Sequence, residues 1–291
     1  MDFAQQLVNG VQIGSVYALV AIGYTMVYGI AKMINFAHGD SIMVGSYVAL
    51  LFFQSSGLPV WGVIAATAAV SAVLGVTIER LAYKPLRGGS RMSALITTIG
   101  VSLMLQNGFL LIFGSSPKPF PNHFTGEGFT LGGVTVSRLT AITLVVTVVL
   151  MVLLTLFVNR TRVGKAMRAV SEDQGAAQLM GINIDTSISI TFAIGSALAA
   201  VAAVLYSSTY PLINPYMGSM LGLRAFIAAV IGGIGVIPGA MIGGFILGIA
   251  EALIKRYISS AMADAIVFAL LIIVLLVKPS GLLGRNEREK V

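Results

Sequence analysis

Long apolar runs alternate with short polar segments along almost the whole chain of 291 residues. The hydrocarbon core of a bilayer is about 30 Å thick, and a helix needs roughly 20 residues to cross it. Eight apolar segments therefore predict membrane helices, although the second is short and the last is near the lower limit of length. The segments lie at about 11–31, 41–53, 58–78, 92–113, 139–158, 187–206, 225–250 and 262–277.

The seventh apolar segment is interrupted in its middle by glycines and a proline, residues that end a helix or free its backbone groups. One interpretation is a broken helix, with two half-helices that enter and leave the membrane from the same side. The alternative is a continuous helix whose small residues allow close packing. We favour the broken helix because it places the C-terminal tail on the basic side of the membrane. The interrupting residues are Gly232, Gly233, Gly235, Pro238 and Gly239.

The distribution of basic residues predicts which loops face the cytoplasm. Residues 80–91 and 160–168 each contain four Lys or Arg residues, whereas residues 114–137 contain one, together with three prolines. Cytoplasmic loops of membrane proteins carry an excess of Lys and Arg. The first two loops are therefore predicted to be cytoplasmic and the third external, which places the N-terminus outside. The tail, with Lys278, Arg285, Arg288 and Lys290, is then inside.

The composition narrows the fold to an all-α polytopic membrane protein. Hydrophobic residues make up 57% of the chain and charged residues 10%, with a mean hydropathy of +0.93; a soluble domain carries about 25% charged residues. The net charge of +7 lies in short clusters between apolar runs, unlike the basic face of a nucleic-acid-binding protein. We expect residues 1–291 to form a single transmembrane domain. The first apolar run lacks the features of a cleaved signal peptide and is expected to remain as a helix.

The sequence offers no catalytic or nucleotide-binding motif. Cysteine is absent, which excludes a catalytic thiol or a thiolate metal site. The two histidines, His38 and His123, are far apart, and the single Gly-Lys pair, Gly164–Lys165, lacks the remainder of a phosphate-binding loop. We expect neither enzymatic activity nor a metal or other cofactor, and any ATP must be bound by partner subunits.

Asn35, His38 and Asp40 lie between the first two apolar runs, in a chain with few polar groups. Three interpretations are open. The residues form a solvated turn at the membrane surface, they cap the following helix through its free N–H groups, or they bind a proton or substrate at membrane depth. Interrupted segments in both halves of a chain are typical of inverted-repeat transporters, so an inverted repeat is a further hypothesis.

Polar residues also lie within the fourth apolar segment. Thr98, Ser102 and Gln106 are four residues apart and share one face of a helix. They either hold neighbouring helices together or line an aqueous translocation path. The candidate path-lining residues are Thr97, Thr98, Ser102, Gln106 and Asn107.

The longest cytoplasmic segment, about residues 159–186, alternates apolar and charged residues and predicts short amphipathic helices. Ser171 is expected to cap the second of them, and Gly181 to end it. The segment either lies on lipid headgroups or docks a cytoplasmic partner; Glu172 and Asp173 favour the partner because the inner leaflet is anionic. The candidate docking residues are Arg160, Arg162, Lys165, Arg168, Glu172, Ala176, Ala177 and Gly181.

Three stretches of the sequence resemble one family of membrane proteins. They are NFAHGDSIMVGSYVA (35–49), GKAMRAVSEDQGAAQLMGIN (164–183) and LRAFIAAVIGGIGVIPGAMIGGFILGIAEAL (223–253). Their order and content are similar to the permease subunits of bacterial ABC importers for branched-chain amino acids, and closest to the LivH type. The resemblance covers nearly the whole chain.

The resemblance implies a membrane subunit that acts with other proteins. These are a second permease subunit, two cytoplasmic ATPase subunits and a periplasmic substrate-binding protein, assembled in the bacterial inner membrane. It also implies that the segment at 159–186 contains the helices that couple the permease to the ATPase. The importers often carry Glu-Ala-Ala-x3-Gly there; Ala176, Ala177 and Gly181 match this spacing, but Gly175 stands in place of the glutamate.

Two other functional classes remain open from the sequence. The substrate could be urea, an amide or another amino acid, because permeases of this kind differ in substrate. Alternatively, the chain could be an ion- or proton-coupled secondary carrier that acts alone. The scarcity of deep ionisable residues argues against a proton-coupled carrier, which usually needs a carboxylate relay.

Overall fold

The computed structural model describes residues 2–87, 89–124, 126, 128–131 and 133–284. Within these residues the fold is almost entirely helical, and six helices are long and apolar enough to cross a membrane. Two further apolar helices, α9 and α11, are shorter. The predicted all-α membrane protein is therefore confirmed. The C-terminal residues Arg285, Arg288 and Lys290 lie outside the described part.

Each predicted apolar segment contains a helix, and the cytoplasmic segment contains two more. The α-helices are α1 (Asp2–Ala31), α2 (His38–Ser55), α3 (Val60–Ile78), α4 (Arg91–Phe113), α5 (Arg138–Arg160), α6 (Arg162–Glu172), α7 (Gln174–Leu179), α8 (Ile184–Thr209), α9 (Met217–Gly232), α10 (Ile237–Tyr257) and α11 (Ala263–Val277). A π-helical turn, η1 (Glu79–Tyr83), and a 3-10 turn, η2 (Lys84–Leu86), extend α3. The short strands are β1 (Lys118–Pro119), β2 (Phe129–Leu131), β3 (Val134–Val136) and β4 (Leu212–Ile213).

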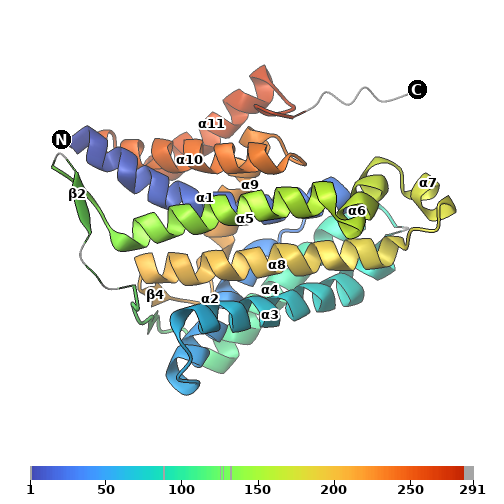
Figure 1. Cartoon of the computed structure of the whole chain (residues 1–291), viewed down its shortest axis with the longest axis horizontal. Helices are drawn as coiled ribbons and strands as arrows, with labels where there is room; N and C mark the ends of the chain where they lie inside the picture. Colours follow the sequence, from blue (N-terminus) through green and yellow to red (C-terminus); the bar gives the residue numbers. More distant parts are fainter. Residues whose placement is uncertain (1, 88, 125, 127, 132, 285–291) are drawn as a thin grey trace.

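The long helices run side by side, with distinct structures at the two ends of the molecule (Figure 1). Helices α6 and α7 lie at one end, and the labelled strands β2 and β4 lie at the other. Strand β1 pairs with β4, and β2 pairs with β3, both antiparallel. We call these the α6–α7 end and the strand end. The core lies between α1, α8 and α10, where alanines and glycines let helix backbones approach closely.

Helices α1 to α3 and helices α8 to α10 repeat the same order of elements in opposite directions. A long helix (α1 or α8) is followed by a non-helical turn, a helix that starts deep in the molecule (α2 or α9) and a returning helix (α3 or α10). Helix α1 packs antiparallel on α10, and α8 packs antiparallel on α3. The long helix of each repeat thus packs on the returning helix of the other repeat, as expected for an inverted repeat.

The predicted break in the seventh apolar segment is present. Helix α9 ends at Gly232, and Gly233 and Gly235 have φ values of 108° and 95°, which L-residues with side chains rarely adopt. Helix α10 begins at Ile237, with Pro238 in its first turn, where the missing N–H does not disturb the helix. The continuous-helix alternative is wrong. The predicted pair of half-helices is wrong for its second member: α9 is short, but α10 has 21 residues and is long enough to cross a membrane.

The segment at 80–91 is more ordered than a loop. Helix α3 continues through η1 and η2 as far as Leu86, and α4 begins at Arg91. Pro85 lies within η2, and a proline within a helix removes one backbone hydrogen bond and displaces the preceding turn. The extension places Glu79, Tyr83 and Arg87 beside the first turns of α8, where they make the contacts described below.

Candidate functional site

The polar turn that precedes α2 is buried in the middle of the helix bundle. The imidazole of His38 lies between the middle of α1 and the middle of α8: a Cβ atom added at Gly23 would lie 2.6 Å from its Nε2, and one added at Gly195 would lie 3.5 Å from its Cε1. Asn35, His38 and Asp40 are each 4% exposed or less. The solvated surface turn is therefore wrong for this segment.

Helix α9 starts at the same depth as α2, and the first turns of the two helices touch. Gly39 of α2 contacts Gly218 and Gly222 of α9 through backbone atoms. Two helix N-termini, each at the positive end of its helix dipole, therefore meet in the centre of the molecule. Broken helices with this arrangement form substrate sites in other transporters.

A group of polar side chains surrounds this crossing, and we call it the central polar cluster: Asp40, Ser102, Gln106 and Ser219. The amide nitrogen of Gln106 lies 3.0 Å from Asp40 Oδ1, 3.0 Å from Ser102 Oγ and 2.8 Å from Ser219 Oγ, so its two hydrogens can be shared among these three acceptors. Asp40 and Gln106 are buried, Ser102 is half-buried and Ser219 is exposed. The cluster thus joins α2, α4 and α9 and reaches the surface of the subunit at Ser219.

Asn35 and Asp40 do not cap α2, in contrast to the second interpretation. The N-cap is Ala37, which has no side-chain hydrogen bond. Instead Asn35 Oδ1 accepts a 2.6 Å bond from the hydroxyl of Tyr83, because η1 brings that tyrosine beside the turn. Two buried side-chain atoms next to this turn, His38 Nε2 and Asp40 Oδ2, are among those that have no hydrogen-bond partner in the described residues.

The candidate path-lining residues of α4 divide between two faces. Ser102 and Gln106 belong to the central polar cluster, and Thr98 is buried on the same face with its hydroxyl bonded to the carbonyl of Leu95. Asn107 is exposed and bonds to its own helix at Leu103, and Thr97 is half-buried. The glycines and proline between α9 and α10 lie a helix length away from Gly218, about 20 Å, and do not join the cluster.

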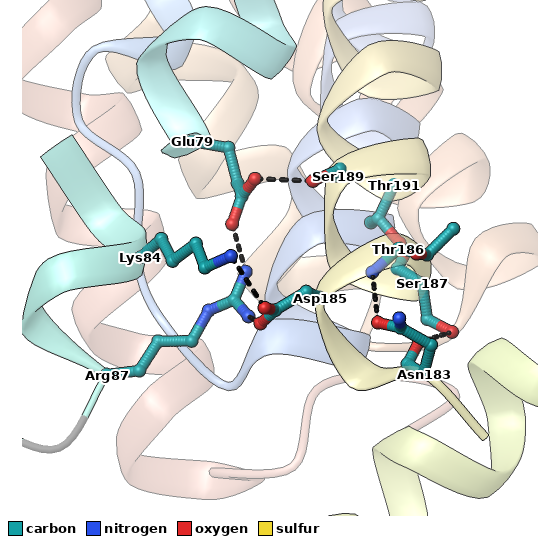
Figure 2. Close-up of polar contacts among 9 residues, drawn as sticks. All are labelled: Glu79, Lys84, Arg87, Asn183, Asp185, Thr186, Ser187, Ser189 and Thr191. Atoms are coloured by element: carbon teal, nitrogen blue, oxygen red, sulfur yellow. Dashed lines mark hydrogen bonds and ion pairs between the residues drawn. The ribbon is translucent and has the colours of Figure 1, made fainter. Parts of the chain in front are cut away.

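A cluster of ion pairs ties the start of α8 to the extension of α3 at the α6–α7 end (Figure 2). Glu79 is fully buried and pairs with Arg87, which also pairs with Asp185. Lys84 lies 2.7 Å from Asp185, and the hydroxyl of Ser189 donates to Glu79 at 2.6 Å. The group, which we call the α3–α8 ion cluster, borders an open cavity of about 610 Å³.

A second cluster of ion pairs lies toward the strand end. Glu251 of α10 is 1% exposed and pairs with Arg224 at 2.9 Å and with Lys255 at 2.5 Å. Arg224 also pairs with Asp264, and the hydroxyl of Tyr17 donates to Glu251 at 2.6 Å. This group joins α1, α9, α10 and α11.

The segment between α5 and α8 forms the predicted pair of amphipathic helices. Helix α6 buries Gly164, Met167 and Val170 and exposes its basic side chains. Asp173, rather than Ser171, caps α7 by accepting from the N–H of Ala176 at 3.0 Å. The Ser171 hydroxyl instead donates to the carbonyl of Arg168 within α6. The exposed members of the docking set are Arg160, Arg162, Lys165, Arg168, Glu172, Ala176 and Gly181, and Ala177 is buried.

Gly181 ends this helical pair as predicted. Helix α7 stops at Leu179, and Gly181 has a φ of 80°, which favours glycine. Two residues later, Asn183 caps α8 by accepting from the N–H of Thr186 at 3.0 Å. The chain therefore passes from α7 through one glycine turn directly into the α3–α8 ion cluster.

Five residues of these clusters were not predicted from the sequence as site residues: Glu79, Arg87 and Asp185 of the α3–α8 ion cluster, together with Tyr83 and Ser219. Glu79 was detectable, because it follows an apolar run directly and an ionisable residue at that position is unusual. Its partners were not, because Arg87 and Asp185 are separated by almost a hundred residues. Ser219 had no distinguishing signal in the sequence.

Comparison with known proteins assigns the family. The family described as "Branched-chain amino acid transport system / permease component" matches residues 6–275. The permease protein BraD of a high-affinity branched-chain amino acid transport system, from Pseudomonas aeruginosa, is 48% identical and covers 99% of this chain and 98% of the relative. The corresponding LivH protein of Escherichia coli K12 is 49% identical over the same shares.

More distant proteins are similar over part of the chain or in fold. The ribose import permease protein RbsC of Escherichia coli K12 is 25% identical and covers 68% of this chain and 60% of the relative. The solved structure of PsaBC from Streptococcus pneumoniae in complex with Fab covers 96% of this chain and 93% of that chain, with 15% identity and a TM-score of 0.47. The match over residues 6–275 and the relatives near 48% identity establish the family. The chain therefore belongs to the family of permease components of branched-chain amino acid transport systems, as its sequence motifs indicated.

Proposed function

We propose that this chain is the permease subunit of an ABC importer and forms part of the path by which branched-chain amino acids cross the inner membrane. The observation that carries the proposal is the identity of 48–49% to BraD and LivH over 99% of the chain. A second permease subunit, two ATPase subunits and a periplasmic binding protein complete the transporter. Energy comes from the ATPase subunits.

In this proposal the α6–α7 end faces the cytoplasm and the strand end faces the periplasm. The basic residues Arg160, Arg162, Lys165 and Arg168 lie at the α6–α7 end, in agreement with the excess of positive charge in cytoplasmic loops. Helix α1 runs antiparallel to α10 and starts at the strand end, where Gln5 donates to the carbonyl of Thr135 at 3.0 Å. The N-terminus is then periplasmic, and α11 returns the chain to the cytoplasm.

Helices α6 and α7 are the part that docks the ATPase. Leu179 and Met180 are 90% and 82% exposed at the tip of α7, and large apolar side chains at a polar surface typically mark a protein contact. Movement of α7 would pass through Gly181 to the start of α8 and from there, through Asp185 and Arg87, to the buried Glu79. The ion cluster thus links the docking helices to two membrane helices.

The central polar cluster is the candidate substrate path. It lies at the crossing of two helix N-termini and reaches the subunit surface at Ser219. A surface position fits a path that runs between this subunit and a second permease. Alternating access then requires α2 and α9 to separate or close while the long helices remain packed.

The test is uptake by the complete transporter in liposomes. We expect labelled leucine to enter only when the binding protein, both ATPase subunits and ATP are present. Uptake by the isolated subunit driven by an ion gradient would instead establish a secondary carrier and contradict the proposal. Competition by valine and isoleucine, but not by urea or short amides, tests the substrate class.

A further inference from the structure

The central polar cluster contains a buried carboxylate whose charge is not balanced by another side chain. Three carboxylates are buried in the described part of the chain: Asp40, Glu79 and Glu251. Glu79 pairs with Arg87, and Glu251 pairs with Arg224 and Lys255. Asp40 is only 1% exposed, yet it has no ion pair with any side chain in the described part of the structure.

The groups around Asp40 stabilise an anion but do not cancel its charge. Its side-chain hydrogen-bond partners are the uncharged Ser102 and Gln106, and the amide of Gln106 lies 3.0 Å from Oδ1. Asp40 also lies in the first turn of α2, where the helix dipole favours a negative group by a fraction of a unit charge. The other oxygen, Oδ2, is buried and has no partner among the described residues. Ionisable groups buried in membrane proteins are rare and usually functional, and the unpartnered Oδ2 is available to accept a hydrogen bond from a cationic group.

The surroundings of Asp40 provide places for the other parts of an amino acid. The N-terminus of α9, which touches Gly39, offers a partial positive charge for a carboxylate. Three aromatic rings form a row from the surface toward the first turns of α2 and α9. The ring centroid of Phe36 lies 6.3 Å from that of Phe226, which lies 5.9 Å from that of Tyr24. Phe36 is 37% exposed, so an apolar side chain could pass along these rings from the surface.

We propose that Asp40 is the counter-ion of the substrate ammonium group during passage through the membrane. The ligand class is a zwitterionic α-amino acid with an apolar side chain. Its ammonium group contacts Oδ2 of Asp40, and its carboxylate faces the N-terminus of α9. This assignment rests on the proposed transport function and adds the contact that distinguishes an amino acid from an apolar acid without an amino group.

Asp40→Asn separates charge from structure. The asparagine amide has nearly the same shape, and its oxygen still accepts from Gln106, so the cluster keeps its geometry. Asp40→Glu keeps the charge but displaces it by one methylene group. Tyr47→Phe is the matched control, because Tyr47 is also buried in α2 and its hydroxyl also lacks a partner among the described residues.

The experiment uses the complete transporter in liposomes, with leucine import and ATP hydrolysis measured together. For Asp40→Asn we expect leucine import to fall about tenfold or more, since that factor corresponds to a modest loss of a charged contact. ATP hydrolysis stimulated by the loaded binding protein should remain, so more ATP is consumed per leucine imported. Asp40→Glu should retain more import than Asp40→Asn, and Tyr47→Phe should match the wild type.

Several outcomes would overturn the assignment. Wild-type import by Asp40→Asn would show that the charge is dispensable. Loss of assembly and ATP hydrolysis by both Asp40→Asn and Asp40→Glu would make Asp40 a structural residue. Import by the wild type that stops with a protonophore, or without Na⁺, at constant ATP would assign Asp40 to an inorganic cation. Failure of the wild-type complex to import any amino acid would instead refute the proposed function itself.

Discussion

Gly39 of α2 and Gly218 of α9 meet so closely that a Cβ atom added at either would overlap or touch the carbonyl oxygen of the other. The two glycines therefore set the distance between the two helices that start in the centre of the molecule. We predict that Gly39→Ala and Gly218→Ala each destabilise the protein by about 1–3 kcal/mol, the range found when a methyl group is forced into a packed core. Thermal unfolding of the purified protein in detergent measures this change.

The control for this prediction is Gly100→Ala in α4. Gly100 is also helical, but no atom lies within 4 Å of an added Cβ, and alanine is the better helix former by roughly 1 kcal/mol. The unfolding temperature of this variant should stay unchanged or rise slightly. Equal stability of Gly39→Ala and Gly100→Ala would contradict the close contact between α2 and α9.

The elements of this fold were predictable because the bilayer imposes a simple pattern. Every apolar segment contains a helix, and the break after Gly232 was detectable because glycines and a proline cannot continue an ordinary helix. The depth of α2 was not predictable from the local pattern. Polar residues between apolar runs usually mark a surface turn, and only the packing of His38 between α1 and α8 places this turn in the core.

The candidate site was predictable only in part, for a related reason. The four-residue spacing of Ser102 and Gln106 correctly placed the two side chains on one face of α4, since a helix repeats every 3.6 residues. The sequence could not show that this face meets Asp40 and Ser219, because those contacts join residues 66 and 113 positions apart. Long-range pairing depends on how the helices pack, and most apolar helix faces can pack in several ways.

Tyr83 and Tyr47 allow a matched test of the buried hydrogen bond to the turn before α2. Tyr83 donates to Asn35 Oδ1 at 2.6 Å, whereas the buried hydroxyl of Tyr47 has no partner among the described residues. We predict that Tyr83→Phe lowers the free energy of unfolding by about 1–3 kcal/mol, because it leaves a buried amide oxygen unsatisfied. Tyr47→Phe should have almost no effect. A loss of the same size in both variants would show that the hydrogen bond is not the cause.

Arg224 and Glu251 can be tested with a double-mutant cycle. Arg224→Met leaves the buried Glu251 with Lys255 as its remaining cationic partner in the described structure, and breaking a buried ion pair from one side costs roughly 3–5 kcal/mol. Removing the carboxylate as well, in Arg224→Met with Glu251→Gln, should restore part of this loss. The expected interaction free energy is about 0.5–3 kcal/mol. Additive effects of the two substitutions on unfolding would argue against direct coupling.

Leu179 and Met180 provide a test of ATPase docking that leaves the fold intact. Because both side chains are exposed at the tip of α7, replacing them by aspartate should change the stability of the isolated subunit by less than about 0.5 kcal/mol. Co-purification of the ATPase subunits and leucine import should both be lost, since charges in the apolar centre of an interface disrupt binding. The matched control is Phe129→Asp in β2, which places a charge at an apolar side chain that is 65% exposed at the strand end and should leave ATPase co-purification unchanged. Retained ATPase binding by the double aspartate variant would remove α7 from the docking surface.

Single cysteines distinguish a water-filled path from dry helix packing, and the cysteine-free chain suits this approach. A thiol reacts with water-soluble reagents as the thiolate, which needs contact with water. Ser102→Cys, at a half-buried position of the central polar cluster, should react in the assembled transporter, whereas Thr98→Cys should be protected because Thr98 is fully buried. Leu111→Cys, 87% exposed on the apolar part of α4, should also stay unmodified if that face contacts lipid. Reaction of Ser102→Cys that changes when ATP binds would show that the cluster opens and closes during transport; protection of Ser102→Cys in every nucleotide state would place the path elsewhere.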